Sequence, residues 1–211
     1  MSPPPPAAAA RRALNSPFSF VLPVSSLRRK SRTPSLTLPD YLRPGLQLLF
    51  IGLNPGRYSA QTGKYFARPS NRFWPALSAS GLLGGSVQAG DEAMLLERGI
   101  GFTDVVKRAT GQIGELTAQE IAAGARALRR KLERHAPRVA CVIGVSGMRW
   151  LFALPQRERI EPGPQPWRIA TTVFYLLPST SPANAHYRRE QIVAEFRRCA
   201  NWLAAHGIRF C

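Results

Sequence analysis

Three short apolar runs along the chain predict β-strands that are buried inside a sheet. They cover residues 46–51, 139–144 and 172–177, and apolar side chains dominate each of them. Short apolar runs bounded by turn-forming residues are typical of strands with both faces covered. The first run ends directly on Gly-Leu-Asn-Pro-Gly at residues 52–56, which marks a sharp turn.

Segments with apolar residues at helical spacing alternate with these runs. They predict helices over residues 71–83, 91–98, 117–135, 146–152 and 190–205. This alternation predicts an α/β fold, here a three-layer sandwich whose central, mostly parallel sheet is flanked by helices. Residues 99–110 and 160–168 are expected to form loops, the second because it is rich in proline.

The balance of charges favours an acidic partner. The chain has 211 residues, with 29 Lys or Arg against 12 Asp or Glu, for a net charge of +17. Residues 1–39 hold six of the basic residues and no acidic one, so residues 40–211 have 23 and 12, a charge of +11. Nucleic acid is the first candidate partner, and a membrane surface or an acidic protein is the alternative.

Residues 1–39 differ in composition from the remainder, which we expect to form one domain over residues 40–211. They are rich in Pro, Ala, Ser and Arg, a composition that buries too little apolar surface to fold, and predict a disordered basic extension. Three roles for this extension remain possible: an organelle transit peptide, an arm that binds DNA loosely, and an inert extension. The compartment stays equally open between cytoplasm or nucleoid, nucleus and organelle, and the basic cluster at residues 28–32 is a weak nuclear signal.

Neither the cysteines nor the histidines form a metal-binding pattern. Three of each are scattered along the chain, so we expect no metal, no other cofactor and no disulfide framework. No apolar stretch has the length that a membrane-spanning helix needs, and we expect no membrane partner.

Asn54 lies where a catalytic group is expected in this fold class. Ligands of open α/β sheets bind beyond the carboxyl ends of the strands, and Asn54 follows the first predicted strand. Its amide does not titrate near neutral pH, but it both donates and accepts hydrogen bonds and can hold a water molecule. The alternative is an ordinary Asn-Pro-Gly turn.

Several separated segments resemble, in the same order, the mismatch-specific uracil-DNA and thymine-DNA glycosylase family of the uracil-DNA glycosylase superfamily. They are GLNPG at 52–56, YFARPSNRFW at 65–74, GIGFTDVVKRAT at 99–110, PRVACVIG at 137–144 and LLPSTSPANA at 176–185. The resemblance extends from about residue 40 to near the C-terminus.

This resemblance implies a DNA repair enzyme, a monofunctional and metal-independent glycosylase that acts as a monomer on DNA. It would flip a nucleotide out of the duplex and hydrolyse the N-glycosidic bond of uracil, with thymine as a further candidate, mispaired with guanine. An abasic site would be the product. The alternatives are a glycosylase that prefers another deaminated base, such as hypoxanthine, and a nucleic-acid-binding domain without catalysis.

By the same resemblance, Asn54 binds the attacking water and the nearby backbone amides of residues 56–59 lie close to the base carbonyl. The implied base pocket consists of Gly52, Leu53, Pro55, Gly56, Tyr58, Ser59, Phe66, Asn71 and Asp104. Phe66 would stack on the flipped base, although an ordinary core position is the alternative. Asn71 would support the loop, and a helix cap is the alternative.

The last segment implies a DNA-binding loop that enters the duplex. It consists of Pro178, Ser179, Thr180, Ser181, Pro182, Ala183 and Asn184. Ser179 and Ser181 would contact phosphates beside the flipped nucleotide, and a simple polar turn is the alternative. Several relatives carry an inserting Arg where this chain has Ala183, which leaves the gap behind the nucleotide poorly filled.

Asp104 is a second departure from the family. An ionised carboxylate would repel a departing base anion, whereas a protonated one can read a base edge or act as an acid. The alternative is a cap or a surface partner of Lys107.

The predicted helix over residues 117–135 carries a basic face. Its members are Arg126, Arg129, Arg130, Lys131 and Arg134. A solvated face and a DNA contact are the two interpretations.

Overall fold

The computed structural model describes residues 36–210, so the predictions for residues 1–35 lie outside the described residues. Leu38 is only 2% exposed and belongs to the core. The Pro39 carbonyl accepts a hydrogen bond from the Tyr65 hydroxyl at 3.0 Å. The packed part of the chain thus includes the last residues of the predicted extension.

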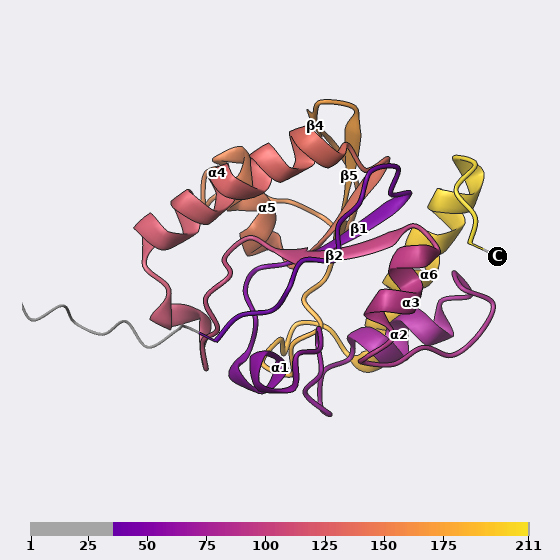
Figure 1. Ribbon diagram of the computed structural model, residues 1–211, viewed down its shortest axis with the longest axis horizontal. Coiled ribbons are helices and arrows are strands. Elements are labelled where there is room, and N and C mark those ends of the chain that lie inside the picture. Colours follow the sequence, from indigo (N-terminus) through magenta and orange to yellow (C-terminus); the bar gives the residue numbers. More distant parts are fainter. Residues whose placement is uncertain (1–35, 211) are drawn as a thin grey trace, which may run out of the picture. The chain divides into compact units, whose positions relative to one another are not determined.

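A five-stranded sheet in the order β2-β1-β3-β5-β4 forms the centre of the molecule (Figure 1). The strands are β1 (Leu48–Gly52), β2 (Ile100–Asp104), β3 (Val139–Ile143), β4 (Gly163–Ile169) and β5 (Thr172–Leu177). The first four in spatial order pair in parallel, and β4 pairs with β5 antiparallel at one edge. This confirms the predicted α/β sandwich.

Helices cover both faces of the sheet. They are α1 (Arg57–Thr62), α2 (Phe73–Ala79), α3 (Glu92–Glu97), α4 (Ala118–His135), α5 (Val145–Phe152) and α6 (Arg189–Ala205), with a short 3-10 turn at Ile113–Glu115. Helices α4 and α5 pack on one face, and α2, α3 and α6 pack on the other (Figure 1). The five predicted helices are present: α2 and α3 are shorter than predicted, α5 and α6 begin one residue earlier, and Thr117 forms the expected capping box with Glu120 of α4.

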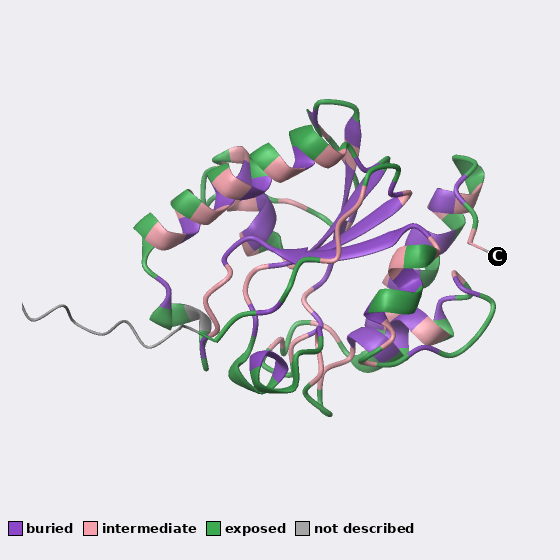
Figure 2. Cartoon of the chain, in the orientation of Figure 1, coloured by how far each residue is buried: buried purple, intermediate pink, exposed green. Residues whose placement is uncertain are grey.

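Alternating side chains of each strand supply two separate core layers. On β1, Leu48 and Phe50 face the layer of α2, α3 and α6, whereas Leu49 and Ile51 face that of α4 and α5. Strands β1, β2 and β3 are buried along their whole length and β5 nearly so, whereas the edge strand β4 and the outer side of α4 are partly exposed (Figure 2). A sheet covered on both faces explains why the central strands are continuous apolar runs.

Two segments that were expected to be loops are strands. Residues 100–104 form β2, where Gly101 interrupts the apolar pattern because a Cβ there would lie 2.5 Å from the Tyr41 carbonyl oxygen. Residues 163–169 form β4 despite Pro164 and Pro166. An edge strand tolerates proline since one side of it needs no ladder hydrogen bonds, and the register of β4 is irregular between Gln165 and Arg168.

Helix α4 approaches the backbone that follows β2 at Gly124. A Cβ at this position would lie 2.3 Å from the Val105 carbonyl oxygen. Val105 and Val106 in turn donate backbone hydrogen bonds to Gly52 and Leu53. The glycine therefore lets α4 press directly on the segment that continues from the ends of β1 and β2.

Gly124→Ala should destabilise the protein. Alanine is favoured over glycine by about 1 kcal/mol in an open helix, but the added methyl group would collide with the Val105 carbonyl, and overpacking of this kind costs about 1–3 kcal/mol. Urea denaturation should show a lower free energy of unfolding. Gly85→Ala is the control, because nothing lies within 4 Å of a Cβ at residue 85. A Gly124→Ala variant as stable as wild type would contradict the close approach.

Candidate functional site

A cleft of about 350 Å³ lies at the carboxyl ends of the parallel strands. Most of the predicted site residues line it: Gly52, Leu53, Asn54, Pro55, Gly56, Tyr58, Ser59, Phe66, Asn71, Asp104, Ser179, Thr180, Ser181 and Pro182. Pro178, Ala183 and Asn184 are not among its lining residues. The structure thus brings together the segments after β1, β2 and β5, which are far apart in the sequence.

The side-chain amide of Asn54 is held in one orientation. Its Nδ2 donates to the Pro55 carbonyl at 3.1 Å, to the Arg108 carbonyl at 3.2 Å and to Thr110 Oγ1 at 2.8 Å. Carbonyl oxygens only accept hydrogen bonds, so the nitrogen must face them and Oδ1 must point the other way. No residue in the range 36–210 donates a hydrogen bond to Oδ1. Oδ1 is therefore available as an acceptor in the cleft.

Thr110 joins the loops that follow β1 and β2. Its backbone N–H donates to the Pro55 carbonyl and its own carbonyl accepts from Arg57, both at 3.1 Å. Its side chain is buried and accepts from Asn54. The segment that ends at Thr110 belongs to the family resemblance, but no role was predicted for the Thr110 side chain, because a lone threonine forms no recognisable sequence pattern.

Asp104 is a buried carboxylic acid beside the cleft. The residue is 3% exposed and its Oδ2 has no hydrogen-bond partner among the described residues. Burial raises the pKa of this carboxyl to about 7, against the opposing effect of nearby Lys107. Lys107 instead binds Asp40 at 2.7 Å, so the interpretation of Asp104 as a surface partner of Lys107 is wrong.

Glycine is required opposite Asp104. The two residues are paired in register on β1 and β2, and a Cβ on Gly52 would lie 2.4 Å from Asp104 Oδ1. The same position would be 3.6 Å from Phe66 Cζ. The glycine therefore allows the carboxyl group and the aromatic ring to meet at the start of the cleft.

Phe66 combines a core contact with a place in the cleft. One face of its ring stacks on Phe73, with centroids 4.1 Å apart, and the half-buried ring also lines the cleft. Its φ of 50° is unusual for a bulky residue and indicates local strain. The core interpretation of Phe66 thus describes one face of its ring, and stacking on a flipped base stays a prediction.

Neighbouring hydrogen bonds hold the strained segment in place. Buried Glu92 accepts from the Tyr65 N–H at 2.6 Å, and Trp74 Nε1 donates to the Tyr65 carbonyl at 2.7 Å. Ser59 Oγ accepts from the Ala67 N–H at 3.0 Å. Ser59 therefore serves the loop as well as the cleft wall.

Tyr58 and Asn71 lie at the edge of the cleft. Tyr58 is 47% exposed, a large fraction for an aromatic side chain. Asn71 Oδ1 accepts from the Phe73 N–H at 3.0 Å, so it serves the start of α2 as a helix cap does.

Arg72 organises the predicted DNA-binding loop. Its guanidinium donates to the carbonyl oxygens of Thr180, Ser181, Asn184 and Tyr187, at distances from 2.5 to 3.4 Å. Within the loop, Asn184 donates to the Ser179 carbonyl and Ser181 Oγ accepts from the Ala183 N–H. Sequence analysis did not assign a role to Arg72, because its acceptors are main-chain atoms that no side-chain pattern indicates.

The loop also packs tightly against the end of β3. Gly144 has a φ of 92°, and a Cβ there would lie 3.3 Å from the Ser179 Cβ. Ala183 lies exposed in this loop, and Pro182 beside it lines the cleft. The loop is thus a rigid edge with a small side chain near its tip.

Two arginines add positive charge to the cleft. Arg57 pairs with Glu115 at 3.0 Å. Arg68 is exposed, and its guanidinium has no partner in the described part of the chain. Arg68 was not singled out from the sequence, and it is placed to meet an anionic ligand.

Residues 36–210 contain neither a cluster of metal-ligating side chains nor a helix suited to span a membrane. No group of three or more metal-ligating side chains is clustered there. No helix in this range combines the length and apolar character needed to cross a membrane.

Asp104→Asn should remove a pH dependence of stability. The carboxyl has a pKa of about 7 in the folded protein against an ordinary value of 3.8. Between these values the folded chain keeps a proton that the unfolded chain releases, so wild type loses up to about 1.4 kcal/mol of unfolding free energy per pH unit as the pH rises. This contribution is complete below pH 3.8 and lost by about pH 7.

Urea denaturation of both proteins from acidic to mildly alkaline pH tests this. Burial also raises the pKa of Glu92. Because Glu92 is present in both proteins, its contribution cancels when the unfolding free energy of the variant is subtracted from that of wild type at each pH. Parallel stability profiles would show that Asp104 is ionised when folded.

Comparison with known proteins shows the family of this chain. The family model described as the Uracil DNA glycosylase superfamily matches residues 39–204. A solution NMR structure of a candidate uracil DNA glycosylase from Methanosarcina acetivorans aligns with a TM-score of 0.56 at 20% identity, over 81% of this chain and 98% of that one. This second likeness concerns the fold. Since the family match extends over most of the sequence, the chain belongs to the uracil DNA glycosylase superfamily.

Proposed function

We propose that this DNA glycosylase hydrolyses the N-glycosidic bond of uracil, with thymine as a second substrate, mispaired with guanine, and leaves an abasic site. The observation that carries this proposal is the fixed amide of Asn54, whose Oδ1 is unused at the end of β1. Such a group can hold a water molecule without taking its proton. In this proposal a nucleotide flipped out of a duplex enters the cleft at the carboxyl ends of the strands.

The reaction needs little more than a positioned water and a stabilised leaving group. The C1′–N bond breaks with its electron pair going to the base, which leaves cationic character on the sugar. A water that donates a hydrogen bond to Asn54 Oδ1 presents a lone pair to C1′. Its oxygen bonds to C1′ and its proton is released to solvent or to the departing base. Preorganised contacts of this kind act without rearrangement during the reaction.

The cleft also offers groups for the base. Phe66 gives an aromatic surface beside Asp104. The backbone N–H groups of Tyr58 and Ser59 have no acceptor among the described residues, and both residues line the cleft. We infer that these donors stabilise the carbonyl oxygen on which negative charge develops.

Asp104 acts in the protonated form in this proposal. With a pKa of about 7, the neutral acid is present at and below neutral pH and can donate a hydrogen bond to a base carbonyl. The ionised form would repel the departing anion. Cleavage is therefore favoured by the same protonation state that stabilises the fold.

Asn54→Ala should lower single-turnover cleavage of a G/U duplex by about 10²- to 10⁴-fold, the usual range for a group that assists proton or water chemistry. DNA affinity should change little. Asn71→Ala is a matched control, because Asn71 also lines the cleft but uses its Oδ1 on the Phe73 N–H. It should lose far less activity.

The measurement uses end-labelled oligonucleotides with uracil, thymine or hypoxanthine opposite each normal base, and alkaline cleavage of the abasic product. Preference for hypoxanthine would favour the alternative deaminated base. Absence of product from every substrate would leave a nucleic-acid-binding domain, and full activity of Asn54→Ala would refute the role of Asn54.

Ala183→Arg should tighten binding to a mismatched duplex by about tenfold, the effect of one charge-assisted contact. Ala183 is exposed on the loop beside the cleft. In this proposal its small side chain would leave the gap behind a flipped nucleotide open. An arginine could fill this gap and bind the orphaned base. Release of the abasic product should become slower.

Cleavage of single-stranded uracil DNA should hardly change, since it has no gap to fill. Fluorescence anisotropy and multiple-turnover kinetics on both substrates make the comparison. Equal effects on the two substrates, or none on either, would show that the loop does not enter the helix.

A further inference from the structure

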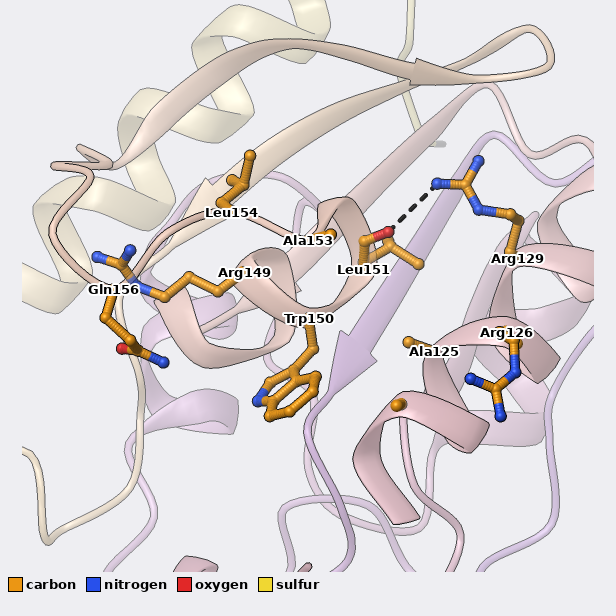
Figure 3. Close-up of a pocket in the computed structure, with 10 residues that line it drawn as sticks. Ala125, Arg126, Arg129, Arg149, Trp150, Leu151, Ala153, Leu154 and Gln156 are labelled. Carbon is orange, nitrogen blue, oxygen red and sulfur yellow. Dashed lines mark hydrogen bonds between the residues drawn. The ribbon is translucent and has the colours of Figure 1, made fainter. Parts of the chain in front are cut away.

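A second hollow, of about 510 Å³, lies between α4 and α5 (Figure 3). None of its lining residues belongs to the cleft at the strand ends. Its volume is in the usual range for sites that bind ligands or side chains of a partner. The hollow is thus a separate feature that the glycosylase reaction does not use.

The floor of the hollow is apolar. It includes Ala125, the half-buried ring of Trp150 and Leu154. Trp150 and Leu154 also pack against the core layer under α4 and α5. An aromatic ring that is only half covered offers contact area for one or two apolar side chains.

Arginines stand on both sides of this floor. Arg126 and Arg129 project from α4 on one side of Trp150, and Arg149 lies on the other (Figure 3). Arg129 uses one nitrogen on the Leu151 carbonyl at 3.2 Å, and Arg149 binds the carbonyls of Pro155 and Glu158. Arg126 has no partner among residues 36–210. No acidic side chain lines the hollow in the described part of the chain.

We propose that this hollow docks a short acidic segment of a partner protein, which inserts an apolar side chain between α4 and α5. Carboxylates on either side of that anchor would pair with the three guanidinium groups, which suit carboxylates well. A phosphodiester backbone would use the arginines but not the apolar floor. The inference goes beyond glycosylase activity and does not depend on it.

The occupant is a different protein rather than a second copy of this chain. Only 12 of the 211 residues are acidic, and the one adjacent pair is Asp91 and Glu92. Glu92 is 1% exposed and binds backbone N–H groups. The chain therefore has no exposed run of adjacent acidic residues of its own to place on the arginines.

The test is fluorescence anisotropy of the full chain with a fluorescein-labelled peptide that carries a Leu-Phe pair between runs of Glu. Arg126→Glu should weaken binding by about tenfold or more, the value of one lost charge-assisted hydrogen bond with added repulsion. Arg130→Glu is the matched control, because Arg130 is exposed on α4 but does not line the hollow. It should weaken binding much less. Urea denaturation should show both variants to be as stable as wild type, because both side chains are exposed.

A second peptide, with Ser-Ser in place of Leu-Phe, distinguishes the contribution of the apolar anchor to binding from that of the carboxylates. Weak binding of this peptide supports the proposal, and binding equal to that of the first peptide overturns it. Equal losses in Arg126→Glu and Arg130→Glu would also overturn it. An undamaged DNA duplex is the competitor. If it displaces the peptide, and if it binds Arg126→Glu but not Arg130→Glu more weakly than wild type, the hollow binds DNA and the proposal is wrong.

Discussion

The three hydrogen bonds from the Asn54 amide nitrogen decide what the cleft can do. They tie the end of β1 to Arg108 and Thr110 in the loop after β2. Because two of the acceptors are carbonyl oxygens, rotation of the amide would bring Oδ1 against them and remove the hydrogen bond that the Arg108 carbonyl accepts. The free Oδ1 is thus fixed before any substrate arrives, which is the condition for electrostatic preorganisation.

Close backbone approaches make this arrangement possible. Gly52 allows the Asp104 carboxyl to lie beside β1, Gly144 allows the loop after β5 to reach β3, and Gly124 allows α4 to press on Val105. A side chain at any of these positions would move one of the loops that meet at the cleft. Arg72 then fixes the last loop through four main-chain carbonyls. Stability of the fold and geometry of the site therefore depend on the same contacts.

The parts of the fold that could be predicted are those with a local signal. Three apolar runs became β1, β3 and β5, and the turn after the first placed Asn54 at the cleft. Strand β2 is interrupted by Gly101 and β4 contains prolines, so their local patterns favoured loops. The side chains of Arg72 and Thr110 act through hydrogen bonds to residues that are 56 to 115 positions away, and the raised pKa of Asp104 comes from burial. Only the tertiary structure creates these properties.

A crystal structure with a duplex that carries 2′-fluoro-2′-deoxyuridine opposite guanine would test the central claim most directly, since the fluorine slows cleavage and preserves the substrate. We expect a water bound to Asn54 Oδ1 and facing C1′ of the flipped nucleotide, with Nδ2 still bound to Thr110. A water held by Asp104 instead, or an Asn54 amide turned so that Nδ2 faces the sugar, would contradict it.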